Sequence, residues 1–247
     1  MNWQQPWIIG NWKMNGRRSS TAAFAQAWAA QRLPENVCTG IAAPLPYLLD
    51  LKQAAPALPV GAQDVSRFDK DGAFTGETSA AMLADLGAQF VLLGHSERRQ
   101  YFGENNETLS AKLDNALAAG LTPILCVGET LVQRQAAQEQ AVVAEQLSVL
   151  RGKVMPHIAV AYEPVWAIGT GQVASAEQIA DMHAFIYAEL LSFANKSANI
   201  RALYGGSVNA QNAQTILTLP NVDGALVGGA SLQADSFAAI VQAAAKQ

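Results

Sequence analysis

Residues 157–171 read His-Ile-Ala-Val-Ala-Tyr-Glu-Pro-Val-Trp-Ala-Ile-Gly-Thr-Gly. The apolar run at the start, with its β-branched members, predicts a buried strand. Glu163 stands where this strand leaves the core, and Pro164 cannot continue a strand ladder because it lacks a backbone N–H. A carboxylate at a strand end, before a loop with an apolar middle and flexible glycines, is the arrangement of a base beneath a lid. A surface loop with a solvated Glu163 and a packed Trp166 fits this segment equally well.

Short apolar runs of the same kind recur along the chain, each followed by turn residues and then by a helical pattern. Their starts lie roughly 25 to 35 residues apart, which is the length of one strand–helix unit. Strands that alternate with helices in this way imply a parallel sheet. The expected strands are Trp7–Trp12, Val37–Ala43, Val60–Asp64, Phe90–Gly94, Pro123–Val127, Ile158–Tyr162, Arg201–Gly205 and Ala225–Gly228.

Two of the intervening helices have recognisable ends. Ser175, with Gln178 three residues later, predicts a capping box at a helix start. Residues 108–117 form a second periodic run, and Gly120 follows it at a position typical of a helix C-terminus. The apolar face of the helix after Ser175 is expected to comprise Ile179, Met182, Ile186 and Leu190.

The number of strands decides between the two parallel architectures. An open, doubly wound sheet would place a glycine-rich phosphate loop after its first strand, but residues 11–15 there read Asn-Trp-Lys-Met-Asn. Glycine-rich turns follow the seventh and eighth strands instead, at residues 205–207 and 228–230, where closed barrels commonly bind phosphate. The sequence therefore predicts an α/β fold: one (β/α)8 barrel of the TIM-barrel type, with a closed eight-stranded parallel sheet, spanning residues 1–247 as a single catalytic domain.

The composition of the chain limits the kinds of partner that it is expected to bind. The chain is 50% hydrophobic and 15% charged, with a formal net charge of −4, so we expect neither a nucleic-acid nor an anionic membrane partner. No run approaches the roughly 18 apolar residues of a membrane span. The N-terminal residues lack the basic start and apolar stretch of a secretory signal. Cys38 and Cys126 lie in apolar segments and predict reduced core thiols in a cytoplasmic protein.

In a (β/α)8 barrel the catalytic groups stand at the C-terminal ends of several strands. The expected strand ends carry Asn11 and Lys13 after the first strand, His95, Ser96 and Glu97 after the fourth, and Glu163 after the sixth. Polar groups far apart in sequence should therefore converge on one mouth of the barrel, beside the two glycine-rich turns.

Each of these residues also has a structural interpretation. Lys13 could be a solvated surface lysine, and His95 could be a histidine that serves only packing. Arg99 is expected on a solvated helix face, whereas Glu97 is better placed to accompany a nearby cation because it adjoins His95. Two histidines stand away from strand ends and are expected to be structural: His157 and His183.

Six motifs, in order along essentially the whole chain, resemble those of triosephosphate isomerases. The motifs are Asn11-Trp-Lys-Met-Asn15, Gly94-His-Ser-Glu-Arg-Arg99, Cys126-Val-Gly-Glu129, Tyr162-Glu-Pro-Val-Trp-Ala-Ile-Gly-Thr-Gly171, Tyr204-Gly-Gly-Ser-Val208 and Gly228-Gly-Ala230. The resemblance implies an aldose–ketose isomerase of glycolysis and gluconeogenesis, an intramolecular oxidoreductase that interconverts dihydroxyacetone phosphate and D-glyceraldehyde 3-phosphate through an enediolate.

The resemblance also implies residue roles. Glu163 matches the family's base, His95 its electrophile, and Lys13 supplies positive charge, with Asn11 as a further donor. Phosphate is expected on backbone N–H groups of Gly169, Ser207, Gly228 and Gly229, because glycine lets the chain approach closely. Supporting positions around the base and the electrophile are expected at Ser96, Glu97 and Cys126. We expect no metal and no organic cofactor.

The expected lid runs from residue 164 to residue 174. It comprises Pro164, Val165, Trp166, Ala167, Ile168, Gly169, Thr170, Gly171, Gln172, Val173 and Ala174. Gln172 departs from the family pattern, which usually has Lys at that position. Since this residue belongs to the far hinge of the lid, the departure bears on lid opening rather than on the chemistry.

The connection at residues 63–77 is long for a strand-to-helix loop and contains Phe68 and Phe74. In the resembled family, this loop enters a pocket of a neighbouring subunit. We therefore expect a homodimer in which Thr75 approaches the partner's active-site loops and Met14 lies in the receiving pocket. A monomer with an ordered Ω-loop is the alternative.

Two other functions fit the same scaffold. A Schiff-base phosphosugar aldolase would need a reactive lysine deep in the barrel, whereas the sixth strand ends in Glu163. A metal aldolase would need several converging ligands, and His95 alone among the histidines is placed at a strand end. A non-catalytic phosphometabolite-binding barrel would be expected to lack the base or the imidazole, and both are present.

Overall fold

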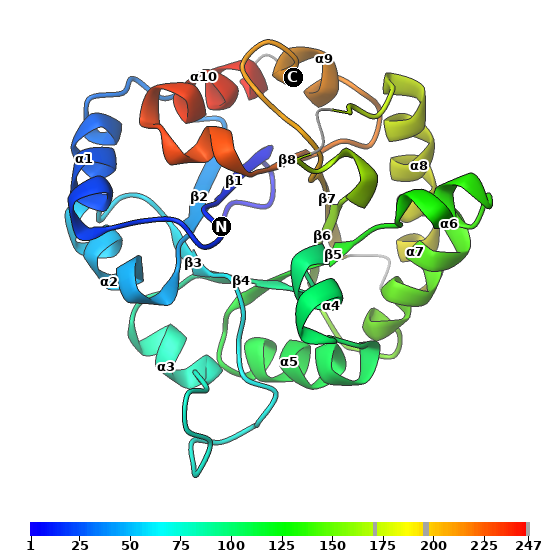
Figure 1. Cartoon of the computed structure of the whole chain (residues 1–247), viewed down its shortest axis with the longest axis horizontal. Coiled ribbons are helices and arrows are strands. Elements are labelled where there is room, and N and C mark those ends of the chain that lie inside the picture. The colour runs from blue at the N-terminus through cyan, green and yellow to red at the C-terminus, as the bar shows by residue number, and fades with distance from the viewer. Residues whose placement is uncertain (170–171, 195–197, 246–247) are drawn as a thin grey trace.

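The computed structural model describes residues 1–169, 172–194 and 198–245. Within them, eight parallel strands close into a barrel in chain order, β1 to β8, which confirms the expected fold (Figure 1). The strands are β1 Trp7–Asn11, β2 Cys38–Ala42, β3 Val60–Ala62, β4 Phe90–Leu93, β5 Thr122–Val127, β6 His157–Tyr162, β7 Asn199–Tyr204 and β8 Gly224–Val227.

Helices surround the barrel as an outer ring (Figure 1). The α-helices are α1 Arg18–Ala29, α2 Leu45–Ala54, α3 Ala80–Asp85, α4 Ser96–Phe102, α5 Asn106–Ala118, α6 Leu131–Gln135, α7 Glu139–Leu147, α8 Ala176–Phe193, α9 Ala213–Leu217 and α10 Ala234–Ala244. Three short 3-10 helices are η1 Ser148–Leu150, η2 Val165–Ala167 and η3 Gly229–Leu232.

The predicted helix signals are confirmed. Ser175 and Gln178 form a capping box at the start of α8, which buries the four expected apolar residues. Gly120 follows the end of α5 with a φ of 75°, a left-handed conformation that suits glycine. The N–H groups of Gly120 and Leu121 return to the last turn of α5.

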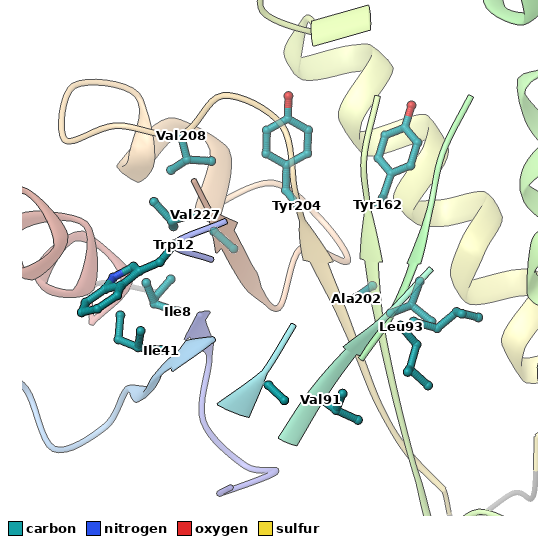
Figure 2. Close-up of a cluster of buried hydrophobic side chains, with 14 of the residues drawn as sticks. Ile8, Trp12, Ile41, Val91, Leu93, Tyr162, Ala202, Tyr204, Val208 and Val227 are labelled. Atoms are coloured by element: carbon teal, nitrogen blue, oxygen red, sulfur yellow. The ribbon is translucent and has the colours of Figure 1, made fainter. Parts of the chain in front are cut away.

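The apolar core has two layers because successive strand residues face opposite sides of the sheet. One layer lies inside the barrel and draws on strand residues such as Trp7, Ile9 and Phe90. The Phe90 ring occupies the space where a Cβ on Gly61 would lie, at 2.4 Å, so small and large residues interlock across neighbouring strands. The second layer packs the other strand faces against the helices. Figure 2 shows part of it, from Ile8, Trp12 and Ile41 to Tyr162 and Tyr204, whose hydroxyls point the same way from adjacent strands.

The register of the strands sets the level of the barrel mouth. Tyr162, the last residue of β6, pairs with Val127 on one side and with Tyr204 on the other. Gly128, Glu163 and Gly205 therefore begin three adjoining loops at the same end of the barrel.

The loop between β3 and α3 projects away from the barrel, beyond the ring of helices (Figure 1). Within it the rings of Phe68 and Phe74 stack, with their centroids 3.6 Å apart. No helix among the described residues is both long and apolar enough to cross a membrane. Cys38 and Cys126 are buried and free, as the sequence predicts.

Candidate active site

A cavity of about 300 Å³ opens at the C-terminal ends of the strands. It brings together residues from the ends of five strands and the loops that follow them, and those predicted from the sequence are Asn11, Lys13, His95, Glu163, Ile168, Gly169, Ser207, Gly228 and Gly229. A larger cavity nearby, of about 390 Å³, lies between Met14, Glu77 and Phe102 and does not include Glu163. Of these two, the smaller cavity is therefore the candidate active site, because it joins the carboxylate, the imidazole and the glycine-rich turns.

Glu163 follows β6 and is almost completely buried, with 2% of its side chain exposed. Its Oε1 lies 2.8 Å from Nε2 of His95, and its Oε2 accepts the backbone N–H of Ser96 at 2.9 Å. Both carboxylate oxygens are thus engaged within the protein. To act on a substrate carbon, the carboxylate has to exchange these partners for the carbon-bound proton.

His95 caps the N-terminus of α4. Its Nδ1 accepts the backbone N–H of Glu97 at 3.3 Å, so the ring proton resides on Nε2 and points at Glu163. A ring held this way can direct its Nε2–H into the cavity as a hydrogen-bond donor.

The pKa of His95 reflects opposing influences. Burial lowers it, but the charge and hydrogen bond of Glu163, together with the charge of Glu97, outweigh burial and raise the pKa above its ordinary value. Since Glu163 supplies the largest opposing contribution, the raised pKa belongs to the resting state, in which the carboxylate faces the ring.

Lys13 adopts a left-handed backbone conformation, with a φ of 51°, which is uncommon outside glycine. Asn11 stabilises it, since its Oδ1 accepts the Lys13 backbone N–H at 3.0 Å. The Nε2 of Gln63 donates to the Lys13 carbonyl at 2.9 Å. The ammonium group is paired with Oε1 of Glu97 at 2.5 Å, with 27% of the side chain exposed. Glu97 thus contacts a cation, as its position beside His95 suggests.

The expected lid begins in an ordered turn. Pro164 leads into η2, Ala167 is fully buried, and its carbonyl accepts the Ser207 hydroxyl at 2.8 Å. Gly169 has a φ of 69° and nothing near the place of a Cβ, so it can approach a ligand closely. Within the expected lid, residues 172–174 are described and Ala174 is buried. Thr170 and Gly171 lie outside the described residues.

A second buried carboxylate, Glu129, anchors the start of the lid. It accepts the indole N–H of Trp166 at 2.8 Å and the hydroxyl of Tyr162 at 3.1 Å. Arg134 lies 3.5 Å away. Burial raises the pKa of Glu129 despite these donors. In the sequence Glu129 falls within a motif that assigns it no role, and its place two residues after a strand end was the available signal.

Glycines at the eighth strand end leave room for a ligand. A Cβ built on Gly229 would meet nothing within 4 Å, and one on Gly228 would meet only the Lys13 side chain at 3.8 Å. Backbone N–H groups exposed in this way, close to an ammonium, suit an oxyanion such as phosphate.

The structure contradicts the solvated position expected for Arg99. Its guanidinium turns inward and donates to the carbonyls of Gly94 at 2.9 Å and Cys126 at 3.2 Å. The left-handed backbone of Gly94, with a φ of 67°, allows this close approach. Burial also raises the pKa of the Cys126 thiol, so Cys126 is a neutral packing residue below the cavity.

Several predicted positions lie outside the cavity wall, Glu97 and Cys126 among them. Ser96 contributes only its backbone N–H, Met14 is 96% exposed, and Thr75 is exposed in the projecting loop. In the described part of the chain, no cluster of three or more His, Cys, Asp or Glu side chains is arranged to hold a metal ion. His157 and His183 lie away from the cavity, on β6 at its N-terminal end and within α8.

Fold and site together define a (β/α)8-barrel enzyme with a buried carboxylate, an imidazole and two glycine-rich turns at one mouth. A family model described as triosephosphate isomerase matches residues 6–244. A triosephosphate isomerase of Neisseria meningitidis serogroup A is 56% identical over 247 residues, covering 98% of each chain. Those of Paracidovorax citrulli and Delftia acidovorans are 49% and 47% identical, covering 96% of this chain and 98% of each relative. The chain belongs to the triosephosphate isomerase family.

Proposed function

We propose that this protein interconverts dihydroxyacetone phosphate and D-glyceraldehyde 3-phosphate, with Glu163 as the base and His95 as the electrophile. The observation that carries the proposal is the buried pair of these two side chains, 2.8 Å apart, in the wall of a cavity that also holds Lys13 and the glycine-rich turns. Family membership supports the substrate.

The reaction moves one proton between adjacent carbons. Glu163 removes a proton from the carbon beside the carbonyl, and the resulting enediolate places charge on two oxygens. The Nε2–H of His95 donates to these oxygens, and a neutral ring can also pass a proton between them. Lys13 and Asn11 add a positive charge and a donor at the same mouth, already in place before the charge develops.

The substrate phosphate would lie opposite the base. Backbone N–H groups of Gly169, Ser207, Gly228 and Gly229 are the proposed cradle, supported by their shared position in the cavity wall. Closure of the lid would exclude water and bring Gly169 onto the phosphate. A proton transfer of this kind uses no metal or organic cofactor, so we expect turnover in the presence of a chelator.

We also propose a homodimer. The cavity of about 390 Å³ beside the active site is open and lined partly by Met14, Leu45 and Phe102, all exposed and apolar. The projecting loop that carries Phe74 and Thr75 could fill such a cavity on a second copy. Sedimentation at micromolar concentration tests this, because a species of only 26.1 kDa would contradict it.

A cytoplasmic location is proposed from the two buried free thiols, which are typical of a reducing compartment. The net charge of −4 supports the absence of nucleic-acid and anionic membrane partners. Cell fractionation with an antibody to the protein would test the location.

The decisive experiment is a coupled assay with D-glyceraldehyde 3-phosphate and a chelator, without added cofactor. Formation of dihydroxyacetone phosphate at a rate that Glu163→Gln abolishes would support the proposal. A six-carbon condensation product would instead indicate a phosphosugar aldolase. Binding of the substrate without any product would indicate a non-catalytic barrel.

A further inference from the structure

Gly128 lies directly beside the proposed base. β5 and β6 pair up to Val127 and Tyr162, so Gly128 and Glu163 are the next residues on the two chains. The Glu163 backbone N–H donates to the Val127 carbonyl at 2.7 Å, and the Val165 N–H donates to the Glu129 carbonyl at 3.1 Å. Hydrogen bonds thus join the two backbones on both sides of Gly128.

The backbones of Gly128 and Glu163 are in close contact, with no room for a side chain between them. A Cβ built on Gly128 would lie 1.7 Å from the carbonyl oxygen of Glu163 and 2.6 Å from its carbonyl carbon. On the other side of the base, a Cβ on Gly205 would lie 2.9 Å from Cγ of Glu163. The base therefore stands in a slot between two glycines, and any displacement of Gly128 reaches the Glu163 main chain directly.

One side chain from the outer ring fixes Gly128. The Gly128 N–H donates to Oε1 of Gln146 at 2.7 Å, and Nε2 of Gln146 donates back to the Gly128 carbonyl at 3.1 Å. Gln146 belongs to α7, outside the barrel (Figure 1). Because its amide engages both polar groups of the glycine, it restrains the residue type with the greatest backbone freedom.

We propose that Gln146 is a positioning residue for the isomerisation, which sets the place of the Glu163 carboxylate through Gly128. The inference rests on the function proposed above. Gln146 touches neither the cavity nor the phosphate cradle, so its loss should act on the proton-transfer step and leave phosphate binding alone. Displacement of a catalytic group by about 1 Å can lower the rate on the order of a hundredfold. Loss of the restraint on Gly128 should displace the Glu163 carboxylate less than this and should therefore lower the rate by a smaller factor.

The test variant is Gln146→Met, which keeps the length and bulk of the side chain and removes both hydrogen bonds. We expect kcat to fall about tenfold while KM and the inhibition constant of inorganic phosphate stay within about twofold of the parent. Gln100→Met is the matched control. Gln100 is exposed on α4 and lines the same cavity of about 280 Å³ behind Glu163 as Gln146 does. It should retain the parent kcat.

A double variant distinguishes an effect of Gln146 on the position of the Glu163 carboxylate from a nonspecific disturbance of the structure. If Gln146 acts through the carboxylate, Gln146→Met should cost much less in a Glu163→Asp background, where the carboxylate is already withdrawn. An unchanged kcat in the folded single variant would overturn the inference, and so would an equal loss of phosphate binding. Circular dichroism checks the fold, and Gln146→Asn, whose amide is too short to reach Gly128, serves if the methionine variant does not fold. Absence of turnover in the parent would instead refute the proposed function.

Discussion

A buried histidine of α8, His183, allows the loss of folding stability at low pH to be predicted. His183 is completely buried, with Nδ1 2.9 Å from the Asn221 carbonyl. In the described structure its Nε2 has no hydrogen-bond partner. The rings of Tyr162 and Tyr204 lie beside it, with centroids 6.0 Å and 6.4 Å from that of His183. Burial lowers the pKa of His183 to about 4.

The pKa of His183 determines the direction and size of its effect on folding stability as the pH changes. An unfolded chain takes up the proton near the ordinary value of 6.5, whereas the folded protein takes it up only near 4. His183 therefore stabilises the fold fully above about pH 6.5, and this stability is lost as the pH falls to about 4. A shift of one pKa unit corresponds to about 1.4 kcal/mol, so the loss is on the order of 2 to 3 kcal/mol at about pH 4.5.

Urea unfolding at about pH 7.5 and about pH 4.5 measures this loss, at one fixed protein concentration. The variant His183→Gln retains a donor for the Asn221 carbonyl but cannot ionise. We expect the parent to lose on the order of 2 to 3 kcal/mol more than the variant between the two conditions, with the same kcat for both at about pH 7.5. Parallel pH dependence in the two proteins would refute a neutral buried His183, and a lower kcat would refute its purely structural role.

Three more outcomes follow from the site. Glu163→Asp withdraws the carboxylate by one methylene and should lower kcat about a hundredfold in the coupled assay; an unchanged kcat would remove Glu163 from the role of base. Glu97→Gln removes one of the charges that raise the pKa of His95. In a plot of kcat/KM against pH, the acidic limb should therefore move to lower pH, and an unchanged limb would contradict this. Deletion of residues 167–169 should leave the barrel folded, slow isomerisation and release methylglyoxal and inorganic phosphate, because the enediolate can expel its own phosphate by breaking the C–O bond once that group is not held in the carbon-chain plane; a slow variant without extra methylglyoxal would limit the lid to binding.

The barrel was predictable because each unit carries its own local signals. Apolar runs end at Gly, Pro or Asn, and strict alternation with helices leaves few ways to bury both faces of the sheet. The boundaries depended on tertiary contacts. β3 was expected over Val60–Asp64 but ends at Ala62. The next residue, Gln63, turns its amide to the carbonyls of Lys13 and Ala42, at 2.9 and 3.0 Å. The sequence of residues 60–64 does not predict that the Gln63 side chain forms these hydrogen bonds where the strand ends.

The convergence of Lys13, His95 and Glu163 was also predictable, since the carboxyl ends of parallel strands meet at one mouth. The residues that hold them were not. Gln63 supports Lys13 from another strand, and Gln146 reaches Gly128 from a helix, each across a long stretch of sequence. A glutamine on a helix has the same local signature whether its amide meets solvent or a main-chain carbonyl. Such partners become visible only when the chain is folded.

Glu129 and Glu163 show why position in sequence could not by itself identify the base. Both are buried glutamates just after strand ends, on neighbouring strands of the barrel. Glu163 faces His95 and the cavity, whereas Glu129 faces the Trp166 indole and the Tyr162 hydroxyl beneath the lid. Since the Val165 N–H also donates to the Glu129 carbonyl, the start of the lid is tied to β5 while the base beside it must remain free to exchange partners. The different roles expected of two like carboxylates are therefore set by their neighbours. Glu129 accepts hydrogen bonds from the Trp166 indole of the expected lid and from the Tyr162 hydroxyl, whereas Glu163 faces an imidazole at the edge of an open cavity.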